Sequence, residues 1–323
     1  MASATKQTIR LLIELSRYDR YNSLLALFPS IFSTLLSGAS NLRDPSHETT
    51  VLHVYSQMAW CALHCYIFSG AGMVWNDWVD KEIDARVART KNRPLAAGRV
   101  RVSHAIAWMA VQYLVAAAIL LHAVGNLSVW AFAMILETAG TTLYPFAKRP
   151  AARNWYIYPQ YILGALGLPL VISGRAAIHA SKNKTETEGL LATLFHSLPL
   201  SVFIFLWILY YNTAYSYQDI RDDRKMHVQS MYNLGGQRIH AFLVFLGTLV
   251  LINIAWVLGA SGQQSSNWLW TAWMGVWTVV YVVQFSRFEA AKPATGGMVH
   301  KQNVFLGLWN VVVFGVEVFL AQA

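Results

Sequence analysis

Acidic side chains gather in two short clusters, each at the edge of a long apolar segment. The clusters hold Asn76, Asp77, Asp80 and Asp84 in the first case, and Asp219, Asp222 and Asp223 in the second. With Glu82, they account for 7 of the 16 acidic residues of the chain. Carboxylates beside hydrocarbon are unfavourable unless they pair or bind a cation. The pattern therefore predicts bound Mg²⁺, and with it a phosphorylated substrate.

The spacing within each cluster places the acidic side chains on one side of a helix. Asn76, Asp80 and Asp84 follow one another at i, i+4 and i+8, so a continuing helix presents them on one face. Asp219, Asp222 and Asp223 do the same at i, i+3 and i+4. Such oxygen ligands suit Mg²⁺. The alternative is that these acids only stabilise helix ends and balance basic loops; two clusters on one side of a membrane favour a metal–diphosphate site.

Basic and hydroxyl side chains next to the clusters are candidates for binding the diphosphate. Arg is suited to phosphate oxygens because its guanidinium presents paired donors. Besides Asn76, the candidate diphosphate ligands are Arg89, Arg93, Tyr144, Lys148 and Lys225. The alternative role for the basic residues is membrane topology and contact with lipid headgroups, which we expect for Arg99 and Arg101. We expect Asp77, Asp80, Asp219 and Asp223 to be the catalytic carboxylates.

The composition is that of a membrane protein. Of 323 residues, 55% are hydrophobic and 13% are charged, whereas soluble domains carry roughly 25% charged residues. Several apolar runs approach the roughly 20 residues that span a bilayer as a helix. We predict an all-α, polytopic protein with nine spans: Asn22–Ser37, Val51–Trp75, His104–Val124, Ser128–Tyr144, Tyr158–Ser173, His196–Thr213, Ile239–Leu258, Trp268–Phe285 and Asn303–Leu320.

The basic residues predict the orientation of these spans. If residues 1–21 are a cytosolic segment, 21 of the 25 Lys and Arg residues fall on the cytosolic side, as the positive-inside rule requires. The net charge of +9 is thereby explained without a nucleic-acid partner. Both acidic clusters fall on the cytosolic side. Two glycosylation sequons, at Asn126 and Asn183, fall on the lumenal side.

Three ionisable residues lie inside predicted spans: His64, Glu137 and Glu317. An ionisable group within a membrane is a functional candidate, but we expect these three to be paired or interface-facing. Cys61 and Cys65 share a helix face with spacing typical of small core residues. A metal site formed with His64 is a minor alternative, because no fourth ligand is apparent.

The motifs together resemble the UbiA-type intramembrane prenyltransferases, over most of the chain. The matching segments are Ser16–Asn22, the first cluster Asn76-Asp77-x-x-Asp80-x-x-x-Asp84, Arg89–Leu95, Tyr144-x-x-x-Lys148, and Tyr217-Gln218-Asp219-x-x-Asp222-Asp223-x-Lys225. Within this family, the sequence is most similar in character to the fungal meroterpenoid enzymes, which attach farnesyl groups to aromatic polyketides.

The resemblance implies a single transmembrane domain, residues 1–323, with nine helices around a central cavity. It implies Mg²⁺-dependent transfer of a prenyl group, most simply farnesyl, from its diphosphate to a small aromatic acceptor in terpenoid biosynthesis. The bilayer is then the surrounding partner, and no obligate protein partner is implied. The sequons and the secondary-metabolite resemblance suggest the endoplasmic reticulum, with the active site facing the cytosol.

The sequence departs from the family pattern at two places, and two other functions remain as alternatives. His227 stands where the family often has Gly or another small residue, and the stretch from Arg149 to Pro159 is longer than the family pattern predicts. Both bear on loop geometry and the choice of acceptor.

The first alternative function is a UbiA-type terpene cyclase acting on farnesyl diphosphate alone. The second is a cation transporter, which is disfavoured because transporter sites lie near the midplane of the membrane.

Overall fold

The computed structural model describes residues 2–180, 189–260 and 267–322, and all regular structure in these ranges is helical. The elements are α1 (Ala2–Leu15), η1 (Tyr21–Ala26), α2 (Phe28–Arg43), α3 (Val51–Val79), α4 (Lys81–Asp84), α5 (Val102–Val124), α6 (Leu127–Leu143), η2 (Phe146–Lys148), α7 (Pro150–Arg153), α8 (Pro159–Ala165), α9 (Gly167–Ile178), α10 (Leu190–Tyr217), α11 (Ile220–Lys225), α12 (Tyr232–Gly235), η3 (Gly236–Arg238), α13 (Ile239–Ala260), α14 (Asn267–Arg287) and α15 (Thr295–Leu320).

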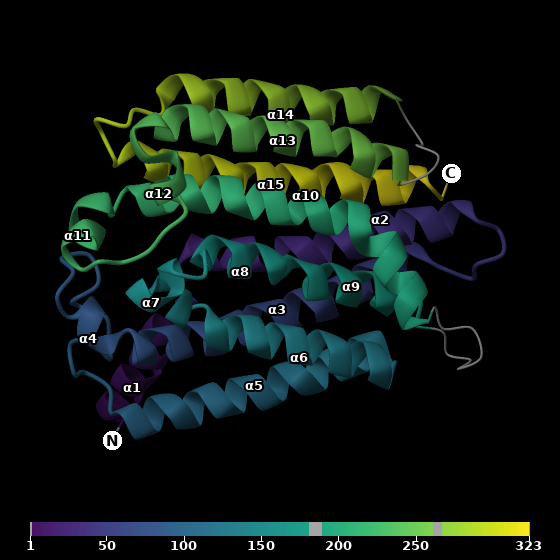
Figure 1. The fold of residues 1–323 in the computed structure, drawn as a ribbon. Helices are drawn as coiled ribbons and strands as arrows, with labels where there is room; N and C mark the ends of the chain where they lie inside the picture. The colour runs from purple at the N-terminus through teal and green to yellow at the C-terminus, as the bar shows by residue number, and fades with distance from the viewer. Residues whose placement is uncertain (1, 181–188, 261–266, 323) are drawn as a thin grey trace.

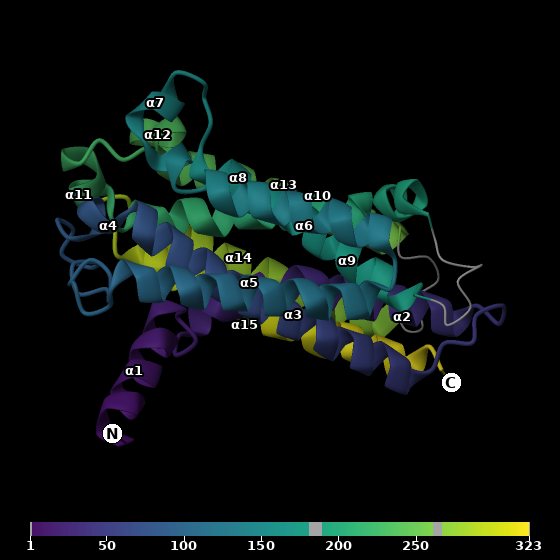
Figure 2. The same cartoon turned by 90° about the horizontal axis from the view of Figure 1, so that it is seen from below.

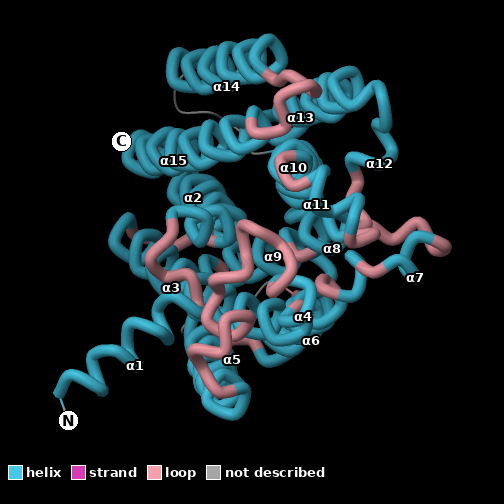
Figure 3. Tube along the Cα trace, turned by 90° about the vertical axis from the view of Figure 1, so that its left-hand side faces the viewer, coloured by secondary structure: helices cyan, strands magenta, loops and turns pink. Residues whose placement is uncertain are grey.

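The long helices lie side by side in one bundle, and the short helices α4, α7, α11 and α12 gather at one end (Figure 1). Figure 3 looks onto this end, where loops and short helices connect the long ones. We call it the Asp end, because both acidic clusters lie there. Helix α1 projects away from the bundle at the same end (Figure 2). The all-helical fold predicted from the sequence is thus confirmed for the described residues.

Six helical stretches in the described part of the chain are long and apolar enough to cross a membrane. They are Val51–Val79, Val102–Val124, Pro159–Ile178, Leu190–Tyr217, Tyr232–Ala260 and Thr295–Leu320. The other three predicted spans correspond to α2, α6 and α14, which form helices within the same bundle. The protein is therefore a multi-pass membrane protein, while the count of nine spans remains a prediction.

The first predicted span is shifted along the chain. We expected a helix from Asn22, but a 3₁₀ segment occupies residues 21–26 and the α-helix begins at Phe28. Pro29 therefore lies in the first turn of α2 rather than inside a helix. The N–H that proline lacks has no intrahelical partner at that position, so Pro29 removes no hydrogen bond from the helix.

The core at the Asp end depends on a close approach between α10 and α15. At Gly296, in the first turn of α15, an added Cβ would lie 1.9 Å from the carbonyl oxygen of Ala214. Only glycine fits there, because that oxygen belongs to the backbone of α10. The contact fixes the last turn of α10 immediately before the second acidic cluster.

Candidate active site

The first acidic cluster lies where α3 gives way to α4. Although α3 ends at Val79, the helical hydrogen bonds continue: Asp80 N donates to Asn76 O (2.9 Å), and Asp84 N donates to Asp80 O (2.8 Å). The predicted common face is therefore largely retained. Asp77, Asp80 and Asp84 are only 2%, 4% and 6% exposed. Three buried carboxylates this close together require positive charge around them.

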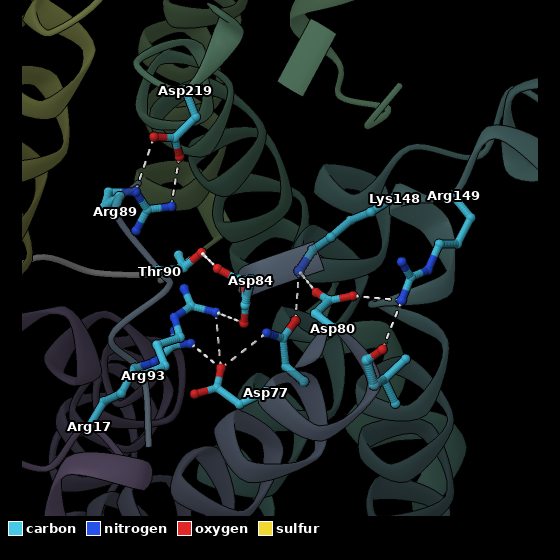
Figure 4. A network of polar contacts seen from close by, with 12 residues as sticks. Arg17, Asp77, Asp80, Asp84, Arg89, Thr90, Arg93, Lys148, Arg149 and Asp219 are labelled. Carbon is cyan, nitrogen blue, oxygen red and sulfur yellow. Dashed lines mark hydrogen bonds and ion pairs between the residues drawn. The ribbon is translucent and has the colours of Figure 1, made fainter. Parts of the chain in front are cut away.

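Asp77 and Asp84 receive that charge from two arginines (Figure 4). Arg17, two residues beyond α1, donates to Asp77 Oδ1 at 2.6 Å. Arg93 donates to the same oxygen at 3.1 Å and to Asp84 Oδ2 at 2.6 Å. Arg93 therefore joins two carboxylates of the cluster, and Arg17 links it to the N-terminal segment.

Asp80 is held by two consecutive basic residues from the loop after α6. Lys148 Nζ lies 2.9 Å from Asp80 Oδ2 and 2.6 Å from Asn76 Oδ1. Arg149 donates to Asp80 Oδ1 at 2.9 Å and also to the carbonyl oxygen of Val79. The Lys148 ammonium lies over the ring of Tyr144, 4.3 Å from its centroid, which is the geometry of a cation–π contact.

The second cluster lies between α10 and α11 and is more open. Asp219 receives two hydrogen bonds from Arg89, at 3.0 and 2.7 Å, in a paired arrangement. Asp223 accepts a hydrogen bond from the hydroxyl of Tyr232 at 2.9 Å. Asp222 is 40% exposed and has a looser partner, Lys225, at 3.6 Å.

Arg89 brings the two clusters together. It belongs to the loop that follows the first cluster, yet its side chain binds Asp219 of the second (Figure 4). The clusters, about 140 residues apart in the chain, therefore lie at the same end of the bundle, as the sequence predicted. In the described ranges, no three Asp, Glu, His or Cys side chains form a group that could hold a metal ion unaided. The carboxylates are paired with Arg and Lys instead.

Burial and charge shift the ionisation of several groups at this site. Burial raises the pKa of Asp84, although Arg93 opposes the shift. Burial also raises the pKa of Asp223 to about 6, opposed by the Tyr232 hydrogen bond and reinforced by Asp219. For Lys148, burial favours the neutral form, but Tyr144 and Asp80 outweigh it and its pKa is raised. The lysine therefore stays charged, whereas the protonated form of Asp223 is favoured relative to a free carboxyl.

Three residues of this site were not predicted: Arg17, Arg149 and Tyr232. Arg17 and Arg149 lie within or beside segments that carry the family resemblance, but nothing in their spacing pointed to the carboxylates. Tyr232 is nine residues after Asp223 and reaches it only because the chain turns back after α11. Lys225, by contrast, was predicted to bind the diphosphate and has a side chain that is 76% exposed.

The ionisable residues within the spans are paired, as expected. His64 Nε2 lies 3.0 Å from Glu137, and its Nδ1 lies 2.9 Å from the carbonyl oxygen of Ala116. Glu317 pairs with Arg43. Cys61 and Cys65 are buried free thiols, and no metal-binding group involving them is found among the described residues.

One of the two predicted glycosylation sites, Asn126, lies between α5 and α6. Asn126 caps α6, its side-chain oxygen accepting from the backbone N–H groups of Ser128 and Val129. Asn183 lies outside the described residues. Modification of either asparagine remains a prediction.

The sequence was compared with models of known protein families. The model of the UbiA prenyltransferase family matches residues 26–316. The chain belongs to the UbiA prenyltransferase family. It is therefore a transferase enzyme.

Curated fungal relatives extend this similarity to nearly the full length of the UbiA chain. It is 44% identical over 321 residues to the polyprenyl transferase pyr6 of Aspergillus fumigatus, covering 99% of this chain and 97% of that one. It is 46% identical to the polyprenyl transferase cle5 of Aspergillus versicolor, covering 96% and 94% of the two chains. The chain is thus most simply described as a UbiA-type polyprenyl transferase.

Solved structures share the fold of this UbiA protein. A UbiA homolog from Aeropyrum pernix, in its apo form, superimposes with a TM-score of 0.66 at 20% identity, covering 91% of this chain and 98% of that one. A UbiA homolog from Archaeoglobus fulgidus bound to GPP and Mg²⁺ gives 0.63 at 12% identity, with coverages of 94% and 99%. At these identities the comparison supports the fold.

The two segments that depart from the family pattern, around His227 and after Arg149, adopt defined backbone conformations. His227 has φ 53°, in the left-handed region that glycine adopts without strain. The long stretch after Arg149 forms α7 and an exposed loop that returns to α8 at Pro159. Both segments lie at the Asp end (Figure 1).

Proposed function

We propose that this enzyme transfers a polyprenyl group, most simply farnesyl, from its diphosphate to an aromatic polyketide acceptor in a Mg²⁺-dependent reaction. The observation that carries the proposal is the contact between Arg89 and Asp219, which places both Asp clusters at one end of the bundle. Basic residues surround the first cluster, so the same region offers both metal ligands and phosphate ligands.

The side chains present fit magnesium in their chemistry. The proposed ligands are all carboxylate or amide oxygens: Asn76, Asp77, Asp80 and Asp84 for one ion, and Asp219, Asp222 and Asp223 for another. Mg²⁺ usually takes one or two protein carboxylates and completes its shell with water and phosphate oxygens. When bound, Mg²⁺ offsets the negative charge of the diphosphate leaving group. The A. fulgidus homolog, solved with GPP and Mg²⁺, supports this assignment.

The basic side chains of the site have a direct role in the proposed reaction. We propose that Arg89, Arg93, Lys148 and Lys225 bind diphosphate oxygens, with Tyr144 donating its hydroxyl. The allylic C–O bond breaks, and its electron pair leaves with the diphosphate, whose growing charge these groups stabilise. An electron-rich aromatic carbon then attacks the allylic cation, forming the C–C bond, and the ring loses a proton. The base that takes this proton is not assigned.

The distribution of charge supports a proposal for the side of the membrane on which the site lies. The Asp end carries Arg17, Arg89, Arg93, Lys148 and Arg149, which is typical of the cytosolic side of a membrane protein. We place the protein in the endoplasmic reticulum with this end in the cytosol. Isoprenoid chains are apolar, so the prenyl donor reaches the site from the bilayer side of the bundle.

Product analysis tests the proposal. Microsomes containing the enzyme are incubated with Mg²⁺ and farnesyl diphosphate, with and without a panel of phenolic acceptors. We expect a prenylated aromatic product only when an acceptor is present, and its loss when EDTA removes the metal. A cyclic hydrocarbon formed from farnesyl diphosphate alone would instead support the cyclase. Ion flux in proteoliposomes without prenyl substrate, together with no turnover, would support the transporter.

A further inference from the structure

Helix α1 leaves the bundle sideways at the Asp end. In Figure 2 it runs across the direction of the long helices, and Figure 3 shows it extending outward beside α3 and α5. Its last turn packs in the bundle, where Leu15 is fully buried. Because the long helices cross the membrane, a helix that runs across them lies along the membrane surface.

The part of α1 outside the bundle has an apolar and a basic side. Ile9 and Ile13 are one helical turn apart and are 53% and 41% exposed. Lys6 and Arg10, also one turn apart, border these isoleucines and are exposed as well. We call Ile9 and Ile13 the isoleucine face. An apolar face flanked by basic side chains is typical of helices that lie in a membrane interface.

A hydrogen-bonded turn fixes the direction in which α1 leaves the bundle. The backbone N–H of Tyr18 donates to the carbonyl oxygen of Ile13 at 3.1 Å. The backbone N–H of Arg17 donates to the carbonyl oxygen of Glu14 at the same distance, which completes a Schellman motif. Arg17 takes the left-handed position of this motif, with φ 58°, and its side chain binds Asp77. The turn is thereby anchored to the first acidic cluster.

The end of α1 lies at the level of two tryptophans. Leu15 belongs to a small core against which Trp78, near the end of α3, and Trp108, near the start of α5, both pack. Trp108 Nε1 also donates to the hydroxyl of Ser16 at 2.8 Å. Tryptophan is enriched where a membrane meets water. We therefore place the start of α1's projection at the depth of the lipid headgroups.

An ion pair shows which way α1 is turned. Glu14 is the acidic residue of this helix, and Arg99 donates to its two carboxylate oxygens at 2.9 and 2.5 Å. Arg99 lies in the loop between α4 and α5, at the Asp end. At roughly 3.6 residues per turn, Ile9 lies roughly 140° around the helix from Glu14. The isoleucine face is therefore turned away from the loops of the Asp end and toward the lipid beside the bundle.

The neighbouring span presents an apolar surface on its outer side. Helix α5 contacts α1 and exposes Val111, Leu114 and Val115 by 51%, 68% and 43%. Lipid tails are as apolar as leucine, so such side chains on the outside of a span face hydrocarbon. The isoleucine face of α1 continues a surface that meets lipid.

We propose that α1 docks on the lipid leaflet at the Asp end. Ile9 and Ile13 enter the boundary between headgroups and acyl chains, and Lys6 and Arg10 bind anionic headgroups. The bilayer is the occupant because α1 lies across the spans, begins at the tryptophan level and turns its apolar side toward lipid. This docking is independent of the prenyl donor and acceptor of the enzyme.

Fluorescence quenching on the full-length enzyme tests the docking. Ile9→Cys and Ile13→Cys are each labelled with an NBD fluorophore, and Gln7→Cys is the matched control, since this exposed residue lies roughly 160° from Ile9. Cys61 and Cys65 are buried, and the unsubstituted enzyme labelled in parallel gives the background. The proteins are placed, one copy each, in nanodiscs of phosphatidylcholine and phosphatidylserine.

We expect labels on the isoleucine face to be quenched by spin-labelled lipid and protected from iodide in the water. The label at residue 7 should show the reverse. Replacing Lys6 and Arg10 with glutamine should lower the ratio of lipid-protected to water-exposed label roughly fivefold for each charge removed.

Two results would overturn the inference. In the first, labels at residues 9 and 13 are as open to iodide as the label at residue 7 in single-copy nanodiscs. In the second, they are protected only in nanodiscs that hold two copies, which would assign the isoleucine face to a second copy of the chain. Product formation is measured separately, so either result leaves the transferase assignment standing.

Discussion

The two Asp clusters contain three aspartates each but lie in different surroundings. In the first, all three carboxylates are buried, and Arg17, Arg93, Lys148 and Arg149 neutralise them. In the second, Asp219 has one arginine, Asp223 has a tyrosine hydroxyl, and Asp222 is 40% exposed with Lys225 as its partner at 3.6 Å. We therefore expect the first cluster to contribute to both folding and chemistry, and the second to contribute mainly to binding the substrate.

Asp80→Ala should have the largest effect, because it removes the common partner of Lys148 and Arg149. Two partly buried cations are then left facing each other, which is unfavourable by about 2–4 kcal/mol after allowance for their partial exposure. We expect product formation to fall below detection and the thermal unfolding midpoint to fall as well. Both are measured on microsomal and detergent-solubilised enzyme. A folded, stable and active Asp80→Ala enzyme would contradict the proposed role of the first cluster.

Asp223→Asn should inactivate the enzyme as strongly but leave its stability nearly unchanged. The amide can still accept the hydrogen bond from Tyr232, and the substitution removes a partly buried carboxylate whose charged form is unfavourable there. Product formation and the unfolding midpoint are compared with those of Asp80→Ala. If Asp223→Asn lowered the unfolding midpoint as much as Asp80→Ala does, the proposal that only the first cluster contributes to folding would be wrong.

The raised pKa of Asp223 predicts an acid limit to magnesium binding near pH 6. Below this pH the carboxyl is protonated and is a poor ligand, so the Mg²⁺ concentration needed for half-maximal activity should rise about tenfold per pH unit. The stability effect has the opposite sign. Because the folded-state pKa exceeds the unfolded one, this group favours folding at low pH, and that contribution is lost as pH rises through about 6.

Tyr232→Phe sharpens the same prediction. Its hydroxyl stabilises the charged form of Asp223, so removing it should move the acid limit toward higher pH. The Mg²⁺ dependence of turnover, measured from pH 5 to pH 8 for both proteins, provides the comparison. Identical profiles would mean that Asp223 does not govern metal binding.

Lys225→Ala should have the smallest effect. The side chain is 76% exposed and lies 3.6 Å from an exposed partner, Asp222. Exposed pairs of this kind contribute about 0–1 kcal/mol, so we expect the KM for the prenyl diphosphate to rise by about twofold to fivefold. A loss comparable to that of Asp223→Asn would show that Lys225 turns inward to the substrate.

Much of the architecture could be predicted because apolar length and residue spacing are local properties. The runs that became α3, α5, α10 and α13 were recognisable from composition alone, since a bilayer requires long apolar helices. The first span was misplaced because Tyr21–Ala26 is apolar enough to continue a helix, yet the chain there takes a tighter 3₁₀ form and α2 begins only at Phe28.

The sequence by itself determined the class of the protein, the two Asp clusters and the basic residues beside them. Residue type and short-range spacing fix these properties, and they do not depend on the rest of the chain. The tertiary structure decided which charges meet: Arg89 with Asp219, Arg17 with Asp77, Tyr232 with Asp223, and Gln229 with the Lys148 loop. These contacts depend on how helices distant in sequence pack, because an ion pair or hydrogen bond forms only where folding brings two groups within about 3 Å.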